Sequence, residues 1–131
     1  MENKDKILMA DGSIINRIHF LQDLKVGDVL VGYTSYWGKT DRYVVSSIGR
    51  KYAALKCGMT GYKMSLSDGI FHYENLSQFN ITFFKTEEEL KAHLNNLKYR
   101  EEVKDTLRKL DVNFLDIEKV VKLKALLEEL Q

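Results

Sequence analysis

The residue pattern changes near Lys85, and this change constrains the fold more than any other feature of the chain. Before Lys85, short apolar and β-branched runs are separated by Gly, Asn and Asp, a pattern typical of antiparallel strands joined by turns. From Thr86 onward, leucines recur three and four residues apart, which is typical of helices that bury one face. The sequence therefore predicts an α+β fold in which a sheet is followed by helices.

About six segments before Thr86 have the character of strands. They are residues 7–9, 14–20, 25–33, 42–57, 61–73 and 80–84. Turns are predicted at Asp11-Gly12, at Gly49 and at Asp68-Gly69, because these residues favour tight reversals of the chain. Short strands joined by short turns predict a small antiparallel barrel of about five to seven strands over residues 1–85.

A first helix is predicted near residues 86–109. Thr86 and Glu89 have the spacing of a capping box, in which the threonine oxygen accepts the Glu89 amide and the glutamate reaches back. The helix has two apolar stripes on opposite sides: Leu90, Leu94 and Leu97, then Tyr99, Val103, Leu107 and Leu110. Either the helix breaks near residues 98–100, or one continuous helix packs on both sides.

A second helix is predicted near residues 116–129. Asp116 is its expected N-cap, and Leu115 and Val120 occupy the positions of a hydrophobic staple. Its broad apolar face is expected to cover the second stripe of the first helix. We expect residues 86–131 to form a helical extension packed on the barrel as a single compact unit. A homodimer is the alternative if much apolar surface remains exposed.

Composition limits the setting of the protein. The 131 residues are 44% hydrophobic and 30% charged, as in an ordinary globular domain. No apolar run approaches the ~20 residues that span a bilayer, and the first residues lack a signal-peptide pattern. Cys57 is the only cysteine, which suits a reducing compartment. We expect a cytoplasmic protein with no membrane partner.

The sequence contains no pattern that names a reaction. His19, His72 and His93 are far apart and lack metal-ligand spacing, and Cys57 stands among small residues. Phosphate-binding and nucleophile-elbow motifs are absent from the sequence. We therefore expect a protein that is not an enzyme and that holds no metal or cofactor.

The segment GYTSYWGKTDRY, residues 32–43, is the best candidate for a binding site. It places Tyr36 and Trp37, the only tryptophan, in a loop between two strands. Two outcomes are open: the Trp37 ring folds over an end of the barrel, or it stays exposed as a contact platform. Residues 39–63 carry six basic residues and one acidic residue. The predicted partner-binding residues are Tyr36, Trp37, Lys39, Arg42, Arg50 and Lys51.

Three motifs resemble small Src-homology-3-like barrel proteins of phages that infect low-GC Gram-positive bacteria. They are Val26-Gly27-Asp28, the run Ile48-Gly49-Arg50-Lys51-Tyr52, and Thr86 to Leu90. The resemblance covers most of residues 24–130 and leaves residues 1–23 as an extra strand pair or a swapped arm. It implies a phage accessory protein in the host cytoplasm, but the group has no shared activity to carry over.

Two functions from different classes follow. In the first, the protein binds a host protein or protein–nucleic-acid complex and inhibits or modulates it; a defence nuclease such as a CRISPR effector is one such target, which would make the protein anti-CRISPR-like. In the second, the barrel binds nucleic acid through Tyr33, Tyr36, Trp37 and Tyr52 beside the basic cluster. The first is favoured, because a pI of about 7.8 is low for a dedicated nucleic-acid domain.

Overall fold

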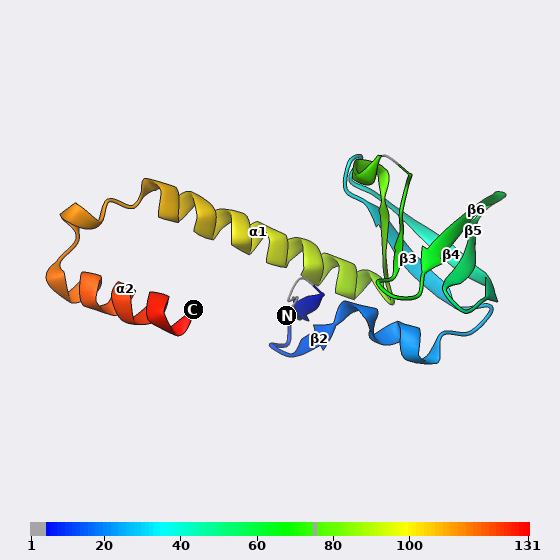
Figure 1. The fold of residues 1–131 in the computed structure, drawn as a ribbon, viewed down its shortest axis with the longest axis horizontal. Coiled ribbons are helices and arrows are strands. Elements are labelled where there is room, and N and C mark those ends of the chain that lie inside the picture. The colour runs from blue at the N-terminus through cyan, green and yellow to red at the C-terminus, as the bar shows by residue number, and fades with distance from the viewer. Residues whose placement is uncertain (1–4, 75) are drawn as a thin grey trace. The chain divides into compact units, whose positions relative to one another are not determined.

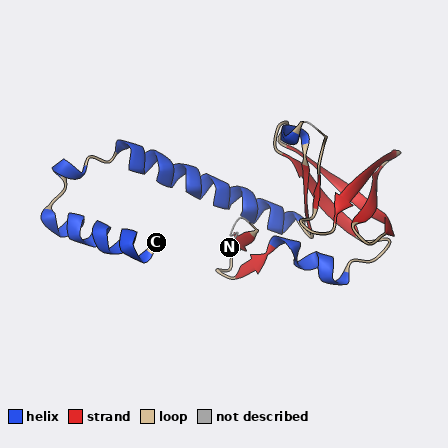
Figure 2. Cartoon of the chain, in the orientation of Figure 1, coloured by secondary structure: helices blue, strands red, loops and turns tan. Residues whose placement is uncertain are grey.

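The computed structural model describes residues 5–74 and 76–131 (Figures 1 and 2). By its internal contacts the chain forms two compact units, residues 1–97 and residues 98–131, and helix α1 begins in the first and ends in the second. The strands are β1 Lys6–Leu8, β2 Ile14–Asn16, β3 Val29–Thr34, β4 Lys39–Ile48, β5 Tyr52–Cys57, β6 Thr60–Ser65, β7 Ile70–Phe71 and β8 Ile81–Phe84. The helices are α1 Glu87–Lys109 and α2 Ile117–Glu129, with 3₁₀ helices η1 Arg17–Asp23, η2 Ser77–Phe79 and η3 Val112–Phe114.

Six antiparallel strands form a nearly closed barrel in the order β6-β5-β4-β3-β8-β7. The seam between β6 and β7 is closed by side chains, because the Tyr62 and Phe71 rings meet edge to face at 5.3 Å. Strand β4 bends at Ser46, an extra residue in the ladder with β5. The barrel and the two helices after it confirm the predicted α+β fold.

The neighbouring strands β3 and β8 are covered on both faces. Leu30 and Phe83 point into the barrel, whereas Val31 and Phe84 point outward into a second apolar cluster. The second cluster also contains Ile7 of the β1–β2 hairpin together with Leu90 and Ala92 of helix α1. This arrangement explains why Phe83 and Phe84, adjacent in the sequence, are both fully buried, since the two faces of β8 contact different apolar clusters.

Residues 5–23 form part of the barrel unit, and the sequence predicted their structure only partly. A hairpin of β1 and β2 turns at Gly12, whose φ of 89° favours glycine. The predicted strand at residues 14–20 is wrong beyond Asn16, because the Asn16 side chain accepts a hydrogen bond from the Ile18 amide and starts η1. Within the described residues, this segment is an extra strand pair in the same chain.

Arg17, the first residue of η1, is buried between the hairpin and the barrel. Its residue exposure is 2%. One guanidinium nitrogen donates to the carbonyl oxygens of Gly69, at 3.3 Å, and Phe83, at 2.9 Å. The other donates to the Asp68 carbonyl and to Oδ1 of Asp5, at 3.1 Å. A single side chain therefore joins η1, the β6–β7 turn and β8.

Helix α1 is continuous through residues 98–100, which settles the alternative that the sequence left open. The Thr86 hydroxyl accepts a hydrogen bond from the Glu89 amide, as the capping box predicts. The Glu89 carboxylate lies 3.1 Å from Nε2 of His19 on η1, which differs from the predicted return to Thr86. The Asn96 side chain makes two hydrogen bonds with the backbone of Leu8 at the edge of β1. Its Oδ1 accepts from the Leu8 amide at 2.9 Å, and its Nδ2 donates to the Leu8 carbonyl at 3.1 Å.

The second unit contains the end of α1, η3 and α2. Both predicted helix ranges agree with the structure within a residue or two. The prediction that the apolar faces of α1 and α2 bury each other is wrong. More than half of the side-chain surface stays exposed at Tyr99, Val103 and Leu107 on α1 and at Val121 on α2. Partial burial is confined to the part of the hairpin near the turn and involves Leu110, Leu115, Val120 and Leu123. Asp116 occupies the N-cap position without a side-chain capping bond.

Candidate functional site

The turn between β3 and β4 holds the two aromatic residues singled out by the sequence. The ladder of these strands runs to the pair Thr34 and Lys39, so residues 35–38 form a tight reversal. Gly38 has a φ of 60°, and its amide donates to the Ser35 carbonyl at 3.3 Å. Tyr36 and Trp37 therefore lie at the tip of a tight hairpin turn and not in a long loop.

Trp37 is an exposed platform supported from one side. Its ring stacks on Phe79 of η2, with centroids 4.8 Å apart and planes at 29°. Tyr36 meets Trp37 edge to face at 5.4 Å and also contacts Phe79 at 4.8 Å. Trp37 is nevertheless 63% exposed and Tyr36 60% exposed. Of the two outcomes that the sequence left open for Trp37, the structure shows the exposed one: the ring packs against Phe79 and is not buried over the end of the barrel.

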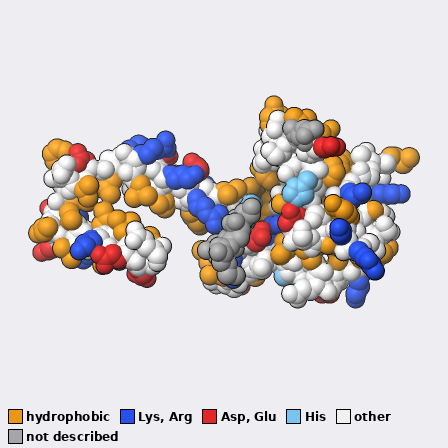
Figure 3. Space-filling model, in the orientation of Figure 1, with side chains coloured by type: hydrophobic (Ala, Val, Ile, Leu, Met, Phe, Trp, Pro, Cys, Tyr) orange, Lys and Arg blue, Asp and Glu red, His pale blue; other side chains and the backbone are white. Residues whose placement is uncertain are grey.

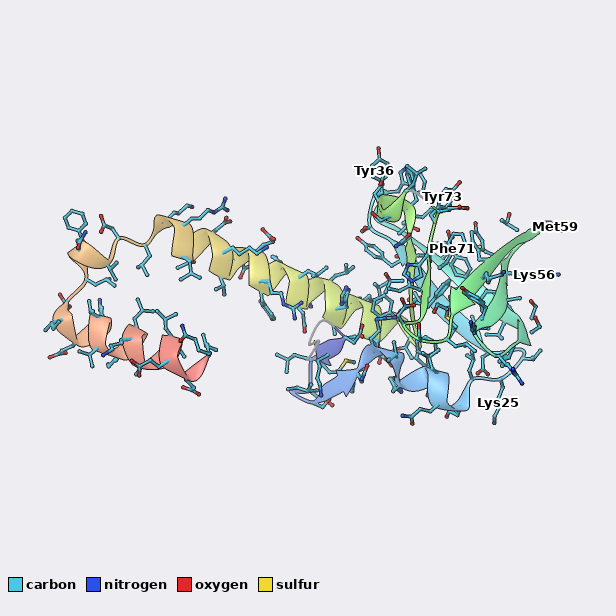
Figure 4. All side chains as sticks on the ribbon, viewed as in Figure 1. Lys25, Tyr36, Lys56, Met59, Phe71 and Tyr73 are labelled. Carbon is cyan, nitrogen blue, oxygen red and sulfur yellow. The ribbon has the colours of Figure 1, made fainter. Side chains whose placement is uncertain are left out.

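A pocket of about 600 Å³ opens beside this platform. Its walls come from β3, β4, β6, β7, η2 and β8 and are mostly aromatic. The lining residues are Thr34, Trp37, Lys39, Asp41, Tyr43, Tyr62, Phe71, Tyr73, Leu76, Phe79 and Ile81. Figure 4 shows Tyr36 and Tyr73 at the same end of the barrel, away from Met59 at the tip of the β5–β6 hairpin. We call this site the aromatic pocket.

The aromatic pocket carries little net charge. Lys39 Nζ lies 3.4 Å from Oδ2 of Asp41, so the two charged residues in its lining form a partly exposed ion pair. Deeper in the pocket, burial raises the pKa of the Tyr43 hydroxyl well above its usual range, so this group stays neutral. The pocket thus presents apolar rings and hydroxyl groups, with one cation and one anion among its lining residues.

The structure does not bring the six predicted binding residues together. Tyr36, Trp37 and Lys39 lie at the aromatic pocket. Arg42 lies on the other face of β4, because side chains alternate along a strand and Tyr43 points inward. Its guanidinium donates to Oε1 of Glu87 at 2.8 Å, and this hydrogen bond lowers the pKa of the Glu87 carboxyl.

Arg50 and Lys51 are distant from the aromatic pocket. They lie in the β4–β5 turn, at the opposite end of β4 from Trp37. The ten residues of β4 span about 30 Å at ~3.3 Å per residue. A basic cluster that is continuous in sequence is therefore divided between two regions of the barrel.

Sequence reasoning missed most of the pocket wall. Tyr62, Phe71, Tyr73 and Phe79 come from β6, from β7 and from the segment up to η2. The aromatic spacing in IFHYENLSQF, residues 70–79, was the available signal, but it reads equally well as core residues of a strand. The convergence of this segment with Trp37 depends on the pairing of β8 with β3, which no local pattern specifies.

The histidines and the cysteine lie apart from the aromatic pocket lining. His19 contacts Glu89, and Nε2 of His72 lies 2.6 Å from Oδ2 of Asp68. His93 packs against the Phe84 ring at 5.1 Å, and Cys57 is partly buried against the barrel core. Over the described ranges 5–74 and 76–131, these side chains do not converge on one another to form a metal-binding group.

These features define the class of protein: a small antiparallel β-barrel with a helical extension and an aromatic surface pocket. A family model of the phage ProQ C-terminal-like domain matches residues 1–130, and the chain belongs to this family. Neither the curated proteins nor the solved structures yielded a significant match.

The family match confirms the phage character that the sequence motifs implied. It also includes residues 1–23, which lay outside the resemblance to Src-homology-3-like accessory proteins. The matched family is not the group that the motifs suggested. Two features of the resemblance are therefore confirmed, the phage origin and the barrel. Within the described part of the chain, no helix has the length and apolarity needed to cross a membrane.

Proposed function

We propose that this phage protein is a non-enzymatic binding protein. It binds a host macromolecule through the aromatic pocket and thereby inhibits or modulates that macromolecule. A host protein, alone or in a complex with nucleic acid, is the favoured partner. A defence nuclease such as a CRISPR effector belongs to this class of target. The observation that carries the proposal is the exposed Trp37 ring, held on Phe79 beside a pocket of aromatic side chains.

Two properties of the site support a protein partner over a nucleic acid there. Exposed aromatic side chains on a fixed scaffold are enriched among interface hot spots, because they add contact area at low entropic cost. The lining cation Lys39 already faces Asp41, and Arg42 faces Glu87 on the other side of β4. Phosphate groups would therefore find little free positive charge beside the rings.

The test compares Trp37→Ala with a matched control, Met59→Ala. Met59 is fully exposed at the tip of the β5–β6 hairpin and lies outside the aromatic pocket. We expect Trp37→Ala to weaken partner binding by about 2 kcal/mol or more, which is about 30-fold in Kd. The Tm should be almost unchanged, because most of the ring is already in water.

Binding is measured by quantitative pull-down from host lysate with the full chain, followed by titration of the captured partner. Equal capture by the wild type, the Trp37→Ala protein and the Met59→Ala protein would remove the aromatic pocket from the proposal. Tryptophan emission of the free wild type provides an independent check: a red-shifted maximum that acrylamide quenches readily is expected for an exposed Trp37.

Nucleic-acid binding is the second candidate function, and a different surface favours it. Lys56 and Lys63 project from the outer face of β5 and β6, where they alternate with buried Leu55 and Met64. Lys63 Nζ lies 5.0 Å from the Tyr52 ring centre. Arg50, Lys51, Lys56 and Lys63 form no ion pair with any described residue. In Figure 3, basic side chains gather over this side of the barrel.

If the outer face binds nucleic acid, affinity for a random single-stranded oligonucleotide should fall steeply with salt. The double variant Lys56→Gln/Lys63→Gln should reduce the slope of log K against log salt by about 1.4, since each lost phosphate contact removes about 0.7. The control is Lys91→Gln/Lys109→Gln, two exposed cations on α1. Binding that is absent at low salt, or equally reduced by both double variants, would exclude this second candidate.

A further inference from the structure

The second unit, residues 98–131, exposes far more apolar surface than its size warrants. None of its described residues is fully buried. Large apolar side chains with exposed fractions from 46% to 87% occur on both helices and on the connection between them. They are Tyr99, Val103, Leu107, Val112, Phe114, Ile117, Val121, Leu126, Leu127 and Leu130.

The distribution of apolar residues around α2 shows that one neighbouring helix cannot cover them all. At 100° per residue, they extend over about 220° of the helix circumference, whereas a helix that packs on one neighbour needs about 100°. They are Ile117, Val120, Val121, Leu123, Leu126, Leu127 and Leu130. Partial burial of Val120 and Leu123 accounts for one side only. The remaining arc needs a second surface.

Helix α1 presents a matching surface in its second half. Tyr99, Val103 and Leu107 follow one another at four-residue spacing and line a shallow hollow together with Glu102 and Thr106. A second hollow is lined by Ile117, Glu118, Val121 and Lys122 of α2. Each helix of the unit thus offers apolar side chains beside a depression, which is the geometry that helices use when they interdigitate.

The amount of apolar surface and its charge both fit a second copy of the same chain. Ten side chains that each expose roughly 100 Å² provide on the order of 1,000 Å² per chain, whereas a stable interface buries about 800 Å² on each partner. Residues 98–131 contain eight basic and eight acidic side chains, so two copies do not repel each other. A neutral, apolar surface of this size favours self-association over a strongly charged partner.

We propose that residues 98–131 form a homodimer interface, in which the helical hairpins of two chains associate around the exposed apolar side chains of α1 and α2. The resulting four-helix arrangement buries the part of α2 that its own α1 leaves exposed. The interface is isologous, so each substitution acts on both copies at once. None of the interface residues lines the aromatic pocket, so a dimer would contain two such pockets.

The test is the mass of the full chain in solution, measured by sedimentation velocity from about 1 to 100 μM, a range that spans ordinary dimer affinities. We expect twice the chain mass at the upper concentrations. Val103→Glu and Val121→Glu should each raise the dimer Kd at least 10-fold, because each places two carboxylates in the apolar contact. Met59→Glu, at a fully exposed site in the barrel unit, should leave the dimer Kd unchanged.

Circular dichroism and the barrel's tryptophan emission check that the variants remain folded. Their sites are already more than half exposed, so the glutamates should not unfold the chain. A wild type that stays monomeric throughout the range would overturn the proposal and leave the hairpin to a different partner. A dimer that is unaffected by Val103→Glu and Val121→Glu would also overturn it. So would a dimer that only Met59→Glu weakens.

Discussion

Replacing Arg17 with alanine is expected to lower the free energy of unfolding of the barrel unit by about 3–5 kcal/mol. The guanidinium donates to three carbonyl oxygens and to Asp5, and it is almost wholly buried. Its removal leaves the Gly69 and Phe83 carbonyls without this donor in a place where water has little access. Lost packing against the Phe84 ring, 5.8 Å from the guanidinium carbon, adds to the effect.

Urea unfolding, followed by circular dichroism and by the emission of Trp37, provides the measurement. Arg17→Lys should recover only part of the loss, because an ammonium group cannot reproduce the fork of the guanidinium. Arg100→Ala is the matched control, since this arginine is exposed on α1. A loss below about 1 kcal/mol for Arg17→Ala would mean that the surrounding carbonyls are hydrated or find other donors.

Gly32→Ala is expected to destabilise the barrel by about 3 kcal/mol and to distort the aromatic pocket. Gly32 lies on β3 opposite Asp41, and its missing side chain leaves room for the Tyr43 ring. An added Cβ would overlap Cε1 of Tyr43 and lie 2.9 Å from Cγ2 of Ile81. Tyr43 and Ile81 both line the aromatic pocket, so the displacement of these side chains changes the shape of the pocket.

Gly61→Ala is the matched control, because Gly61 also lies within a strand and an added Cβ there meets nothing within 4 Å. This control should be neutral or slightly stabilising, since alanine restricts the unfolded chain. Thermal unfolding compares the two variants. Partner binding by Gly32→Ala, measured below its Tm, should be weakened as well. Equal Tm values for the two variants would show that the Tyr43 ring moves aside at little cost.

The sequence predicted the elements whose signals are local. The helices were located within a residue or two, because a capping threonine, leucine spacing and turn residues define them within a few positions. Gly69 was recognised as a turn residue for the same reason, and its φ of 65° agrees. The barrel followed from the number and length of the strands.

The remaining features depend on contacts between distant parts of the chain. Tyr62, Phe71 and Phe79 line the same pocket as Trp37 only because the barrel closes, and their order in the sequence does not reveal this closure. Arg42 was grouped with Trp37 because they are neighbours in the chain, whereas strand alternation places it on the other face. The exposed apolar faces of residues 98–131 were predicted to cover each other, because helical periodicity identifies a face without identifying its neighbour.

The seam between β6 and β7 has a consequence for how the barrel moves. Neighbouring strands elsewhere in the sheet are joined by backbone ladders, but β6 and β7 meet through side chains such as Tyr62 and Phe71. Apart from the hydrogen bond from the Gly69 amide to the Ser65 carbonyl, separation of this seam breaks no backbone pairing between the described residues of the two strands. Local opening should therefore be easiest there, and backbone amide exchange fastest. Because Tyr62 and Phe71 are also walls of the aromatic pocket, this breathing motion would vary the width of the pocket without unfolding the rest of the barrel.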